Sequence, residues 1–331
     1  MSIGPVHGPV YVLPRIPYLR LRVLLRAQKD ATLPAYKGSM LRGAFGHALR
    51  KVVCMMPPEQ PCESCLLRPV CYFTKIFDPF STTPPPPFLQ GLPITPRPYI
   101  FEPGAHVSSD ERHLVAGDPL EFDLLLFGQA TDLQIYALLA IERMAVAGLG
   151  RHRAPFRLER VLCRKPDGSW RSVLEDGRMH GHSGSRPSFP EVNGIDHSRA
   201  VLHFRTPTRL RVEHDHVETT TFPELAEAML RRVMEIAWFH VTNPRIDWYV
   251  DRLLGLARDV RIVRSELRWH DWERFNLQQK TLMNMGGFMG SVEIEGDLEP
   301  FAPLLRAAEI VHVGRGTPFG LGRMEVGSAP S

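Results

Sequence analysis

The sequence has no long hydrophobic segment and no large excess of charge of either sign. No apolar run approaches the ~20 residues that a helix needs to span a bilayer. The apolar stretch PYLRLRVLLR (17–26) is interrupted by Arg20 and Arg22, and this alternation predicts a half-buried strand rather than a secretory signal. The formal net charge is only +4. We therefore expect a cytoplasmic protein, and its charge alone does not require a nucleic-acid partner.

Two common phosphate-binding motifs are also missing. The segment HVGRGTPFGLGRMEV (312–326) is rich in glycine, but its spacing is not the dinucleotide fingerprint, and a strand rather than a helix is expected after it. No Gly-Lys-Ser/Thr is present, which excludes a P-loop. Two interpretations remain. The segment is a tight turn, or its exposed backbone amides bind phosphate with the help of Arg315 and Arg323.

Cysteine is scarce and unevenly placed. Cys54, Cys62, Cys65 and Cys71 form the pattern C-x7-C-x2-C-x5-C, and Cys163 stands alone. In a reducing compartment such a cluster is more often a metal site than a set of disulfides. The central pair has normal zinc spacing and the outer spacings are looser. We predict structural zinc, ahead of reduced metal-free cysteines and of an iron–sulfur cluster, and a buried apolar role for Cys163.

The chain has 331 residues, 44% of them hydrophobic and 23% charged, which suits about two soluble domains. The first half predicts a strand at 17–26, a helix at 38–53 capped by Ser39, a strand at 120–128, a helix at 132–150 that ends at Gly148 or Gly150, and a strand at 156–163. A cysteine-rich insertion (54–71) and a proline-rich stretch (79–98) separate the first helix from the second strand. Proline suits neither a helix nor a sheet interior, so this proline-rich connection should be an extended surface segment.

The second half repeats this plan. It predicts a strand at 200–212, a helix at 221–240, strands near 258–268 and 288–295, a helix at 298–308 and a last strand near 322–326, with a capping box formed by Thr221 and Glu224. Strand-helix-strand-strand-helix-strand is the ferredoxin-like pattern. The predicted fold class is therefore α+β, with tandem ferredoxin-like domains that resemble the RNA-recognition module. The expected division is 1–165 for the first domain, 166–198 for a linker or hairpin, and 199–331 for the second domain.

Four segments carry a family resemblance: SMLRGAFGHALR (39–50), AVAGLGRHRAPFRL (145–158), LHFRTPTRLR (202–211) and the C-terminal stretch 280–326. Together with the cysteine cluster they resemble the CRISPR precursor-RNA processing endoribonucleases of the RAMP superfamily. The resemblance implies metal-independent cleavage of CRISPR repeat RNA by 2′-hydroxyl attack, which gives a 2′,3′-cyclic phosphate, a 5′-hydroxyl and a retained crRNA product. No cofactor is then needed for catalysis, and other subunits of a CRISPR effector complex are candidate partners.

His47 is the leading candidate for proton transfer. On a helical wheel it lies away from the apolar face, and Gly43 one turn earlier leaves space beside it. Histidine can act as acid or base near neutral pH, and the resemblance places a catalytic histidine near this helix. Tyr36 could orient it, and Lys51 could offset negative charge. The alternatives are a solvated His47, a packed Tyr36 and catalysis by His240, whose simpler role is contact with a helix C-terminus.

Basic and glycine residues give the candidate RNA contacts. They are Arg42, Arg50, Arg209, Arg211, Lys280, Gly314, Arg315, Gly316, Gly320, Gly322 and Arg323. Under the resemblance the glycine-rich loop contacts the RNA backbone. By contrast, Arg231 and Arg232 predict a solvated helix face. The alternative function is a non-cleaving RNA-binding RAMP subunit of an effector complex, because KGSMLRG (37–43) would suit such a protein as well.

Overall fold

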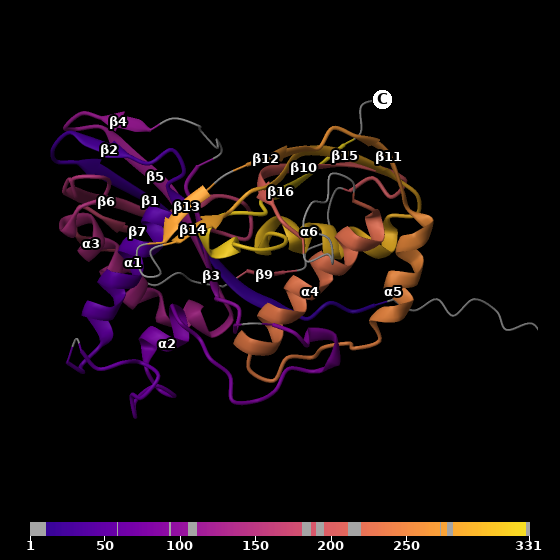
Figure 1. Cartoon of the computed structure of the whole chain (residues 1–331), viewed down its shortest axis with the longest axis horizontal. Coiled ribbons are helices and arrows are strands. Elements are labelled where there is room, and N and C mark those ends of the chain that lie inside the picture. The colour runs from indigo at the N-terminus through magenta and orange to yellow at the C-terminus, as the bar shows by residue number, and fades with distance from the viewer. Residues whose placement is uncertain are drawn as a thin grey trace, which may run out of the picture.

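The structure is a computed structural model. It describes residues 11–57, 59–92, 94–104, 111–180, 187–189, 195–210, 220–271, 273–276 and 281–328, with the backbone alone for 273–276 and 281–284. The described residues form two α+β halves that lie side by side (Figure 1). Within them, every helix is too short or too polar to cross a membrane.

The first half is built on an antiparallel sheet with β1 at its centre. Its strands are β1 (Ile16–Ala27), β3 (Tyr99–Glu102), β5 (Pro119–Phe127), β6 (Phe156–Arg164), β7 (Trp170–Glu175), β8 (Arg178–Met179) and β9 (Ser188–Phe189). The strand order is β3-β5-β1-β6-β7-β8, and β9 pairs with β1. The helices are α1 (Gly38–Val53) and α3 (Gln134–Ala147). The four strands β3-β5-β1-β6 have the ferredoxin-like order, and β7 to β9 extend the sheet with part of the segment that we expected to be a linker or hairpin.

The second half repeats the arrangement. Its strands are β10 (Arg199–Thr208), β11 (Arg261–Ser265), β15 (Gly287–Glu295) and β16 (Met324–Gly327), in the order β11-β15-β10-β16, and β12 (Arg268–His270) also pairs with β15. The helices α4 (Phe222–His240) and α6 (Ala302–Val311) lie on one side of this sheet (Figure 1). The predicted tandem ferredoxin-like fold is confirmed.

Shorter elements complete the structure. The remaining helices are α2 (Tyr72–Ile76) and α5 (Val250–Leu256), and the 3-10 turns are η1 (Pro87–Leu89), η2 (Gly128–Leu133), η3 (Ala257–Asp259), η4 (Glu299–Phe301) and η5 (Thr317–Phe319). Two small ribbons pair β2 (Ala31–Leu33) with β4 (Arg112–Leu114) and β13 (Glu273–Asn276) with β14 (Thr281–Asn284). The turn η5 lies inside the glycine-rich loop.

The alternation in β1 builds the first core. Leu21, Val23 and Leu25 are fully buried and pack in a cluster with Phe45 of α1 and Phe122 of β5. Each such side chain contributes about 1.5–3 kcal/mol relative to an exposed one. The intervening arginines of β1 point away from this core, which explains why a strand with so many charges folds at the centre of a sheet.

The start of α4 and the end of α3 follow the predicted local signals, whereas the start of α1 does not. Thr221 and Glu224 form the predicted capping box of α4, in which the Glu224 carboxylate accepts a hydrogen bond from the Thr221 amide at 2.8 Å. The helix α3 ends before Gly148, whose φ is +93°. The predicted Ser39 cap of α1 is wrong, because the helix begins at Gly38 and Lys37 occupies the cap position without a side-chain bond. A Cβ at Gly38 would overlap the Phe319 carbonyl, so the start of α1 packs directly on η5.

Candidate functional site

The helix α1 presents His47 at the surface. Its Nδ1 atom lies 2.9 Å from the carbonyl oxygen of Gly43, one turn earlier. A carbonyl can only accept, so Nδ1 carries the proton and donates it. In the neutral ring, Nε2 is then the proton acceptor. Apart from the neighbouring residues and the backbone of α1 itself, no described atom comes within 4 Å of where a Gly43 side chain would begin, so the space beside the ring is open. Lys51 is exposed one turn further along the helix. The geometry suits a residue that accepts a proton from a bound molecule.

Tyr36 lies at the other end of α1 and is buried. Its hydroxyl donates a hydrogen bond of 2.7 Å to the carbonyl oxygen of Phe319. Burial raises the pKa of this phenol strongly, and the charge of Glu102 raises it further. The hydroxyl therefore stays protonated at neutral pH. Tyr36 joins α1 to η5, which is the packed role that the sequence left open as an alternative.

Arg42 and Arg50, two of the candidate RNA contacts, are engaged within the protein. The Arg42 guanidinium lies 4.7 Å from the ring centroid of Phe77 and 4.9 Å from that of Phe319. Such cation–π contacts stabilise each pair by about 0.5–2 kcal/mol. The Arg50 guanidinium donates to the carbonyl oxygen of Gln60 at 2.8 Å. Arg42 thus helps to hold the glycine-rich loop on α1, and Arg50 holds the cysteine-rich insertion.

The amides of the glycine-rich loop are largely occupied. The Arg315 amide donates to the Arg209 carbonyl at 2.9 Å, and the Gly322 amide donates to the Pro207 carbonyl at 3.0 Å. The amides of Phe319, Gly320 and Arg323 also have acceptors inside the protein. These five amides cannot serve an RNA phosphate without breaking the loop. The structure therefore gives no support to an anion cradle built from them.

The glycines of the loop have a packing role. Gly314, Gly316, Gly320 and Gly322 all have positive φ, between +72° and +86°. A side chain at Gly320 would overlap the Phe101 carbonyl, and one at Gly322 would overlap the Val313 carbonyl. Only glycine combines this backbone conformation with such close approach. The tight-turn interpretation accounts for these residues.

The arginines of the loop differ in their environment. Arg315 is exposed. Arg323 is half-buried, with one guanidinium nitrogen 3.1 Å from a Glu325 oxygen and another 3.8 Å from a Glu102 oxygen. Arg211 and Lys280, which were also expected to contact RNA, lie outside the described residues. Arg315 is thus the more accessible cation of the pair for a phosphate.

A buried ion cluster joins the two halves of the chain. Glu102 accepts hydrogen bonds from Arg20 at 2.9 and 3.1 Å, and one of its oxygens lies 3.0 Å from Nε2 of His312. The Nδ1 atom of His312 lies 3.0 Å from the Leu321 carbonyl oxygen. His312 therefore links the Glu102 carboxylate to the backbone of the glycine-rich loop through its two ring nitrogens. Burial raises the pKa of Glu102, but the hydrogen bond from His312 and the charge of Arg20 outweigh it and bring that pKa to about 2.

Beside this cluster, a basic pocket of about 400 Å³ opens between the halves. Its charged lining residues are Arg20, Arg164, Lys165, Arg306, Glu309, Arg323 and Glu325. Arg306 pairs with Glu309 at 2.7 Å, whereas Arg164 and Lys165 are exposed. The excess of cations suits a phosphate backbone. Sequence reasoning missed this pocket, although the alternation of arginine in β1 and the Arg-Lys pair at the end of β6 were visible signals.

His240 and its arginine neighbours are structural. His240 is buried, and its Nε2 atom lies 2.6 Å from the Pro96 carbonyl oxygen. Burial lowers its pKa to about 4, against the opposing effect of that hydrogen bond. The prediction of a solvated face is wrong for Arg232, which is 6% exposed, and for Arg231, which donates to the Phe88 carbonyl at 2.6 Å. Helical spacing could not reveal this, because the covering segment is remote in sequence.

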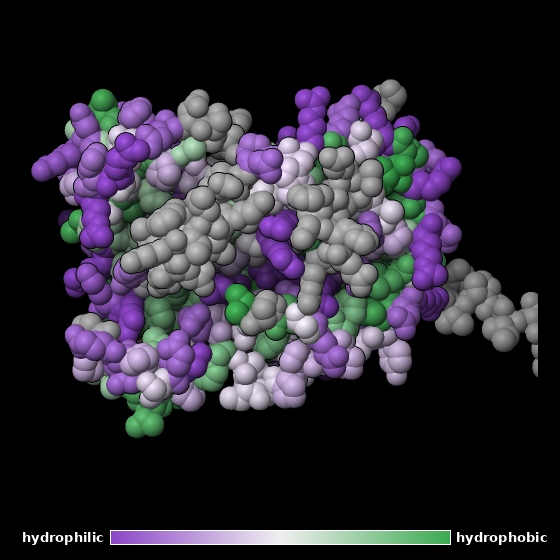
Figure 2. All heavy atoms as spheres, viewed as in Figure 1, coloured by the Kyte–Doolittle hydropathy of each residue, from purple (hydrophilic) through white to green (hydrophobic). Residues whose placement is uncertain are grey.

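The cysteine-rich insertion does not form a recognisable metal centre. Its four cysteines are half-buried, and no group of three or more His, Cys, Asp or Glu side chains suited to a metal ion occurs in the described part of the chain. Met55, Leu66 and Val70 are exposed on this insertion, and hydrophobic surface projects at its place in Figure 2. This arrangement does not support the zinc prediction, which metal analysis of the purified protein would test. Cys163 is buried, as predicted.

Two family models match the chain. One, described as an N-terminal domain, matches residues 16–185, and the other, described as CRISPR-associated endoribonuclease Cas6, matches residues 202–324. No curated protein sequence matches significantly.

Solved structures show the same fold. A Cas6 product complex matches at 18% identity over 93% of this chain and 98% of that chain, with a TM-score of 0.52. Thermus thermophilus Cas6 matches at 17% identity over 94% of this chain and 98% of that chain, with a TM-score of 0.51. A partial Cas6-RT-Cas1–Cas2 complex matches at 13% identity over 97% of this chain and 47% of that chain, with a TM-score of 0.55.

The chain thus shares the tandem ferredoxin-like fold of these solved structures. Its second half, residues 202–324, matches the family model of the CRISPR-associated endoribonuclease Cas6.

Proposed function

We propose that this protein cleaves CRISPR repeat RNA in the precursor transcript without a metal ion and retains the mature crRNA. The match of residues 202–324 to the Cas6 family model supports the substrate class. The observation that carries the proposal is the exposed His47, whose Nδ1 proton is donated to the Gly43 carbonyl and whose Nε2 atom is left to exchange a proton.

The chemistry follows from that geometry. Nε2 of His47 takes the proton of the 2′-hydroxyl at the cut site, and the 2′-oxygen forms a bond to the adjacent phosphorus. The bond from phosphorus to the 5′-oxygen breaks, and the leaving oxygen takes a proton from water to become a 5′-hydroxyl. The other product is a 2′,3′-cyclic phosphate. One general acid or base of this kind contributes about 10²–10⁴-fold in rate. Lys51 offsets the charge that builds on the phosphate oxygens.

RNA binding is assigned to exposed cations. Arg315 of the glycine-rich loop and the two exposed cations of the basic pocket, Arg164 and Lys165, contact backbone phosphates. Tyr36 acts as a positioning residue, since its hydroxyl is committed to the Phe319 carbonyl. The glycines set the shape of the loop and do not themselves form the phosphate site.

Incubation of the purified protein with repeat RNA in EDTA tests the proposal. The expected result is one discrete cut per repeat, blocked by a 2′-deoxy nucleotide at the cut site because the nucleophile is missing. Tight binding without a cut supports the non-cleaving effector subunit instead. A cut that requires added metal contradicts the mechanism.

A further inference from the structure

The proline-rich connection is fixed to α4 at two places. The Arg231 guanidinium donates to the carbonyl oxygens of Phe88 at 2.6 Å and Gln90 at 2.7 Å. Further along, the His240 ring donates to the Pro96 carbonyl. The buried ring is neutral near pH 7, so this bond does not depend on its charge. The proline-rich connection, which the sequence predicted to be an extended surface segment, is therefore packed against the second half of the chain.

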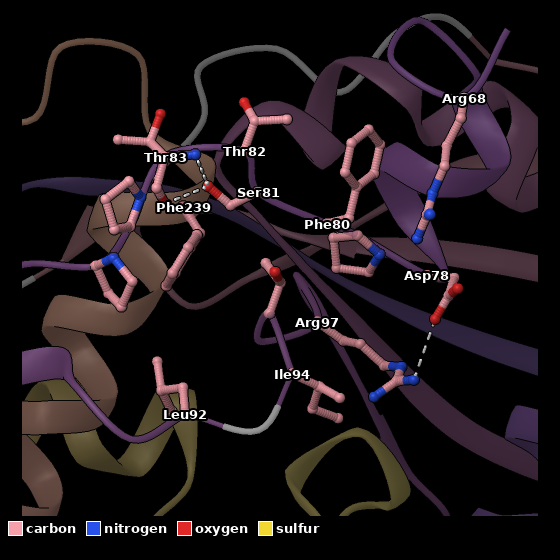
Figure 3. A pocket seen from close by; sticks show the side chains of 14 residues that line it. Arg68, Asp78, Phe80, Ser81, Thr82, Thr83, Leu92, Ile94, Arg97 and Phe239 are labelled. Carbon is pink, nitrogen blue, oxygen red and sulfur yellow. Dashed lines mark hydrogen bonds and ion pairs between the residues drawn. The ribbon is translucent and has the colours of Figure 1, made fainter. Parts of the chain in front are cut away.

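A cavity of about 510 Å³ lies between the proline-rich connection and α4. The volume falls within the range of about 300–1,000 Å³ that is usual for small-ligand sites. Figure 3 shows Arg68, Arg97 and Asp78 on one side of the cavity and Phe239 of α4 on the other, with the hydroxyls of the segment 81–83 along the rim. The lining thus combines cations, aromatic faces and neutral donors.

The cavity has more positive than negative charge. The Arg97 side chain is 18% exposed, donates to the Phe77 carbonyl at 3.1 Å and lies 3.4 Å from the Asp78 carboxylate, which is itself 41% exposed. The Arg68 guanidinium lies over Phe80, 4.3 Å from the ring centroid. Within the described residues, the buried Nε atom of Arg68 has no hydrogen-bond partner. The two guanidinium groups and the single carboxylate leave an excess of one positive charge, which a bound anion would neutralise.

We propose that this cavity binds one nucleotide of single-stranded RNA, an inference that rests on the proposed function. Guanidinium groups are matched to phosphate oxygens. Aromatic rings and stacked guanidinium planes are the surfaces on which unpaired RNA bases stack. Arg97 and Arg68 bind the phosphate, the base stacks on Phe239 or on the outer face of Arg68, and the rim hydroxyls contact the sugar.

The surroundings favour RNA as the source of this nucleotide. Arg97 donates to the Phe77 carbonyl, and the Phe77 ring sits on Gly46, where a side chain would overlap it. Gly46 precedes His47 in α1. The cavity is therefore linked through Phe77 to the helix that carries the proposed proton acceptor. A free nucleotide carries the same chemistry, so the test must separate the two sources.

The test compares Arg68→Gln with wild type and with Arg258→Gln, a matched change at an exposed arginine of η3. The probes are fluorescein-labelled octa-adenylate RNA, followed by anisotropy, and adenosine 5′-monophosphate, followed by equilibrium dialysis. Arg68→Gln should weaken octa-adenylate binding on the order of tenfold, the effect of one lost stacking contact. Arg258→Gln should bind as wild type does. Thermal unfolding of each variant shows whether it folds. If the Arg68→Gln protein does not fold, Phe239→Leu is measured in its place.

The outcomes separate the possibilities. Weakened binding of both probes supports a pocket that accepts a lone nucleotide, and weakened binding of octa-adenylate alone supports a pocket that needs the RNA chain. Folded Arg68→Gln and Phe239→Leu proteins that bind both probes like wild type overturn the inference, while cleavage of repeat RNA could still stand. Wild type that binds adenosine monophosphate but no RNA supports the pocket and contradicts the proposed function.

Discussion

The Nε2 atom of His312 lies 3.0 Å from a carboxylate oxygen of Glu102, and both side chains are buried. This contact joins the start of the glycine-rich loop to β3 of the first half. Arg20 of β1 holds the same carboxylate from within the first half, so Glu102 has partners in both halves of the chain.

Acid should weaken this cluster in a defined pH range. Glu102 has its pKa lowered from 4.5 to about 2 in the folded protein. A lowered carboxyl pKa stabilises the fold above the unfolded pKa, and this stability is lost as pH falls through the folded pKa. The difference corresponds to about 3 kcal/mol. In urea unfolding, wild type should be more stable than Glu102→Gln near pH 6, and the gap should shrink between pH ~4.5 and ~2. A constant gap over that range would contradict the assignment.

The two loop arginines should separate in their effects. Arg315→Ala should weaken RNA binding and reduce its dependence on salt concentration by about one counterion, because Arg315 is exposed to a phosphate. Arg323→Ala should mainly lower stability, because it removes a partner of Glu325 and Glu102. Binding isotherms at several salt concentrations, beside thermal unfolding, measure both effects. If both variants weakened RNA binding equally and Arg323→Ala lost no stability, Arg323 would instead be assigned as an RNA contact.

The glycine loop should tolerate no side chain at Gly320. Gly320→Ala places a Cβ against the Phe101 carbonyl at a φ of +86°, and such a strained substitution costs more than about 1 kcal/mol. Gly43→Ala is the control, because no described atom outside the adjoining part of α1 lies within 4 Å of its new Cβ. It should stabilise α1 by about 0.5–1 kcal/mol. Chemical denaturation measures both variants, and an unperturbed Gly320→Ala protein would refute the packing role of this glycine.

Sequence patterns correctly predicted the elements that are determined by interactions between residues close together in the chain. Alternation predicted β1, helical spacing predicted α1, and the Thr221–Glu224 pair predicted the start of α4. The failures involve partners far apart in sequence. Arg231 and His240 reach the proline-rich connection more than a hundred residues away, and Glu102 meets His312 across 210 positions. Periodicity reports only which face of an element is apolar, so it could not distinguish an arginine that faces solvent from one covered by another segment.

Zinc remains a testable expectation for the insertion. If Cys54, Cys62, Cys65 and Cys71 bind zinc, the purified protein should contain about one equivalent, and Cys65→Ser should lower both zinc content and stability, because binding is coupled to folding. None of the described residues of the insertion is buried, so a bound ion would have a large effect. Metal analysis of protein purified without chelators decides, and the absence of zinc would refute the prediction.

The most direct test of the account is the single-turnover rate of His47→Ala on bound repeat RNA in EDTA. The variant should bind RNA nearly as tightly as wild type and cut it about 10²–10⁴-fold more slowly, since one proton transfer is removed. His197→Ala, a change at another exposed histidine, should cut at the wild-type rate. If His47→Ala also cuts at the wild-type rate, the proposed role of α1 in cleavage is contradicted.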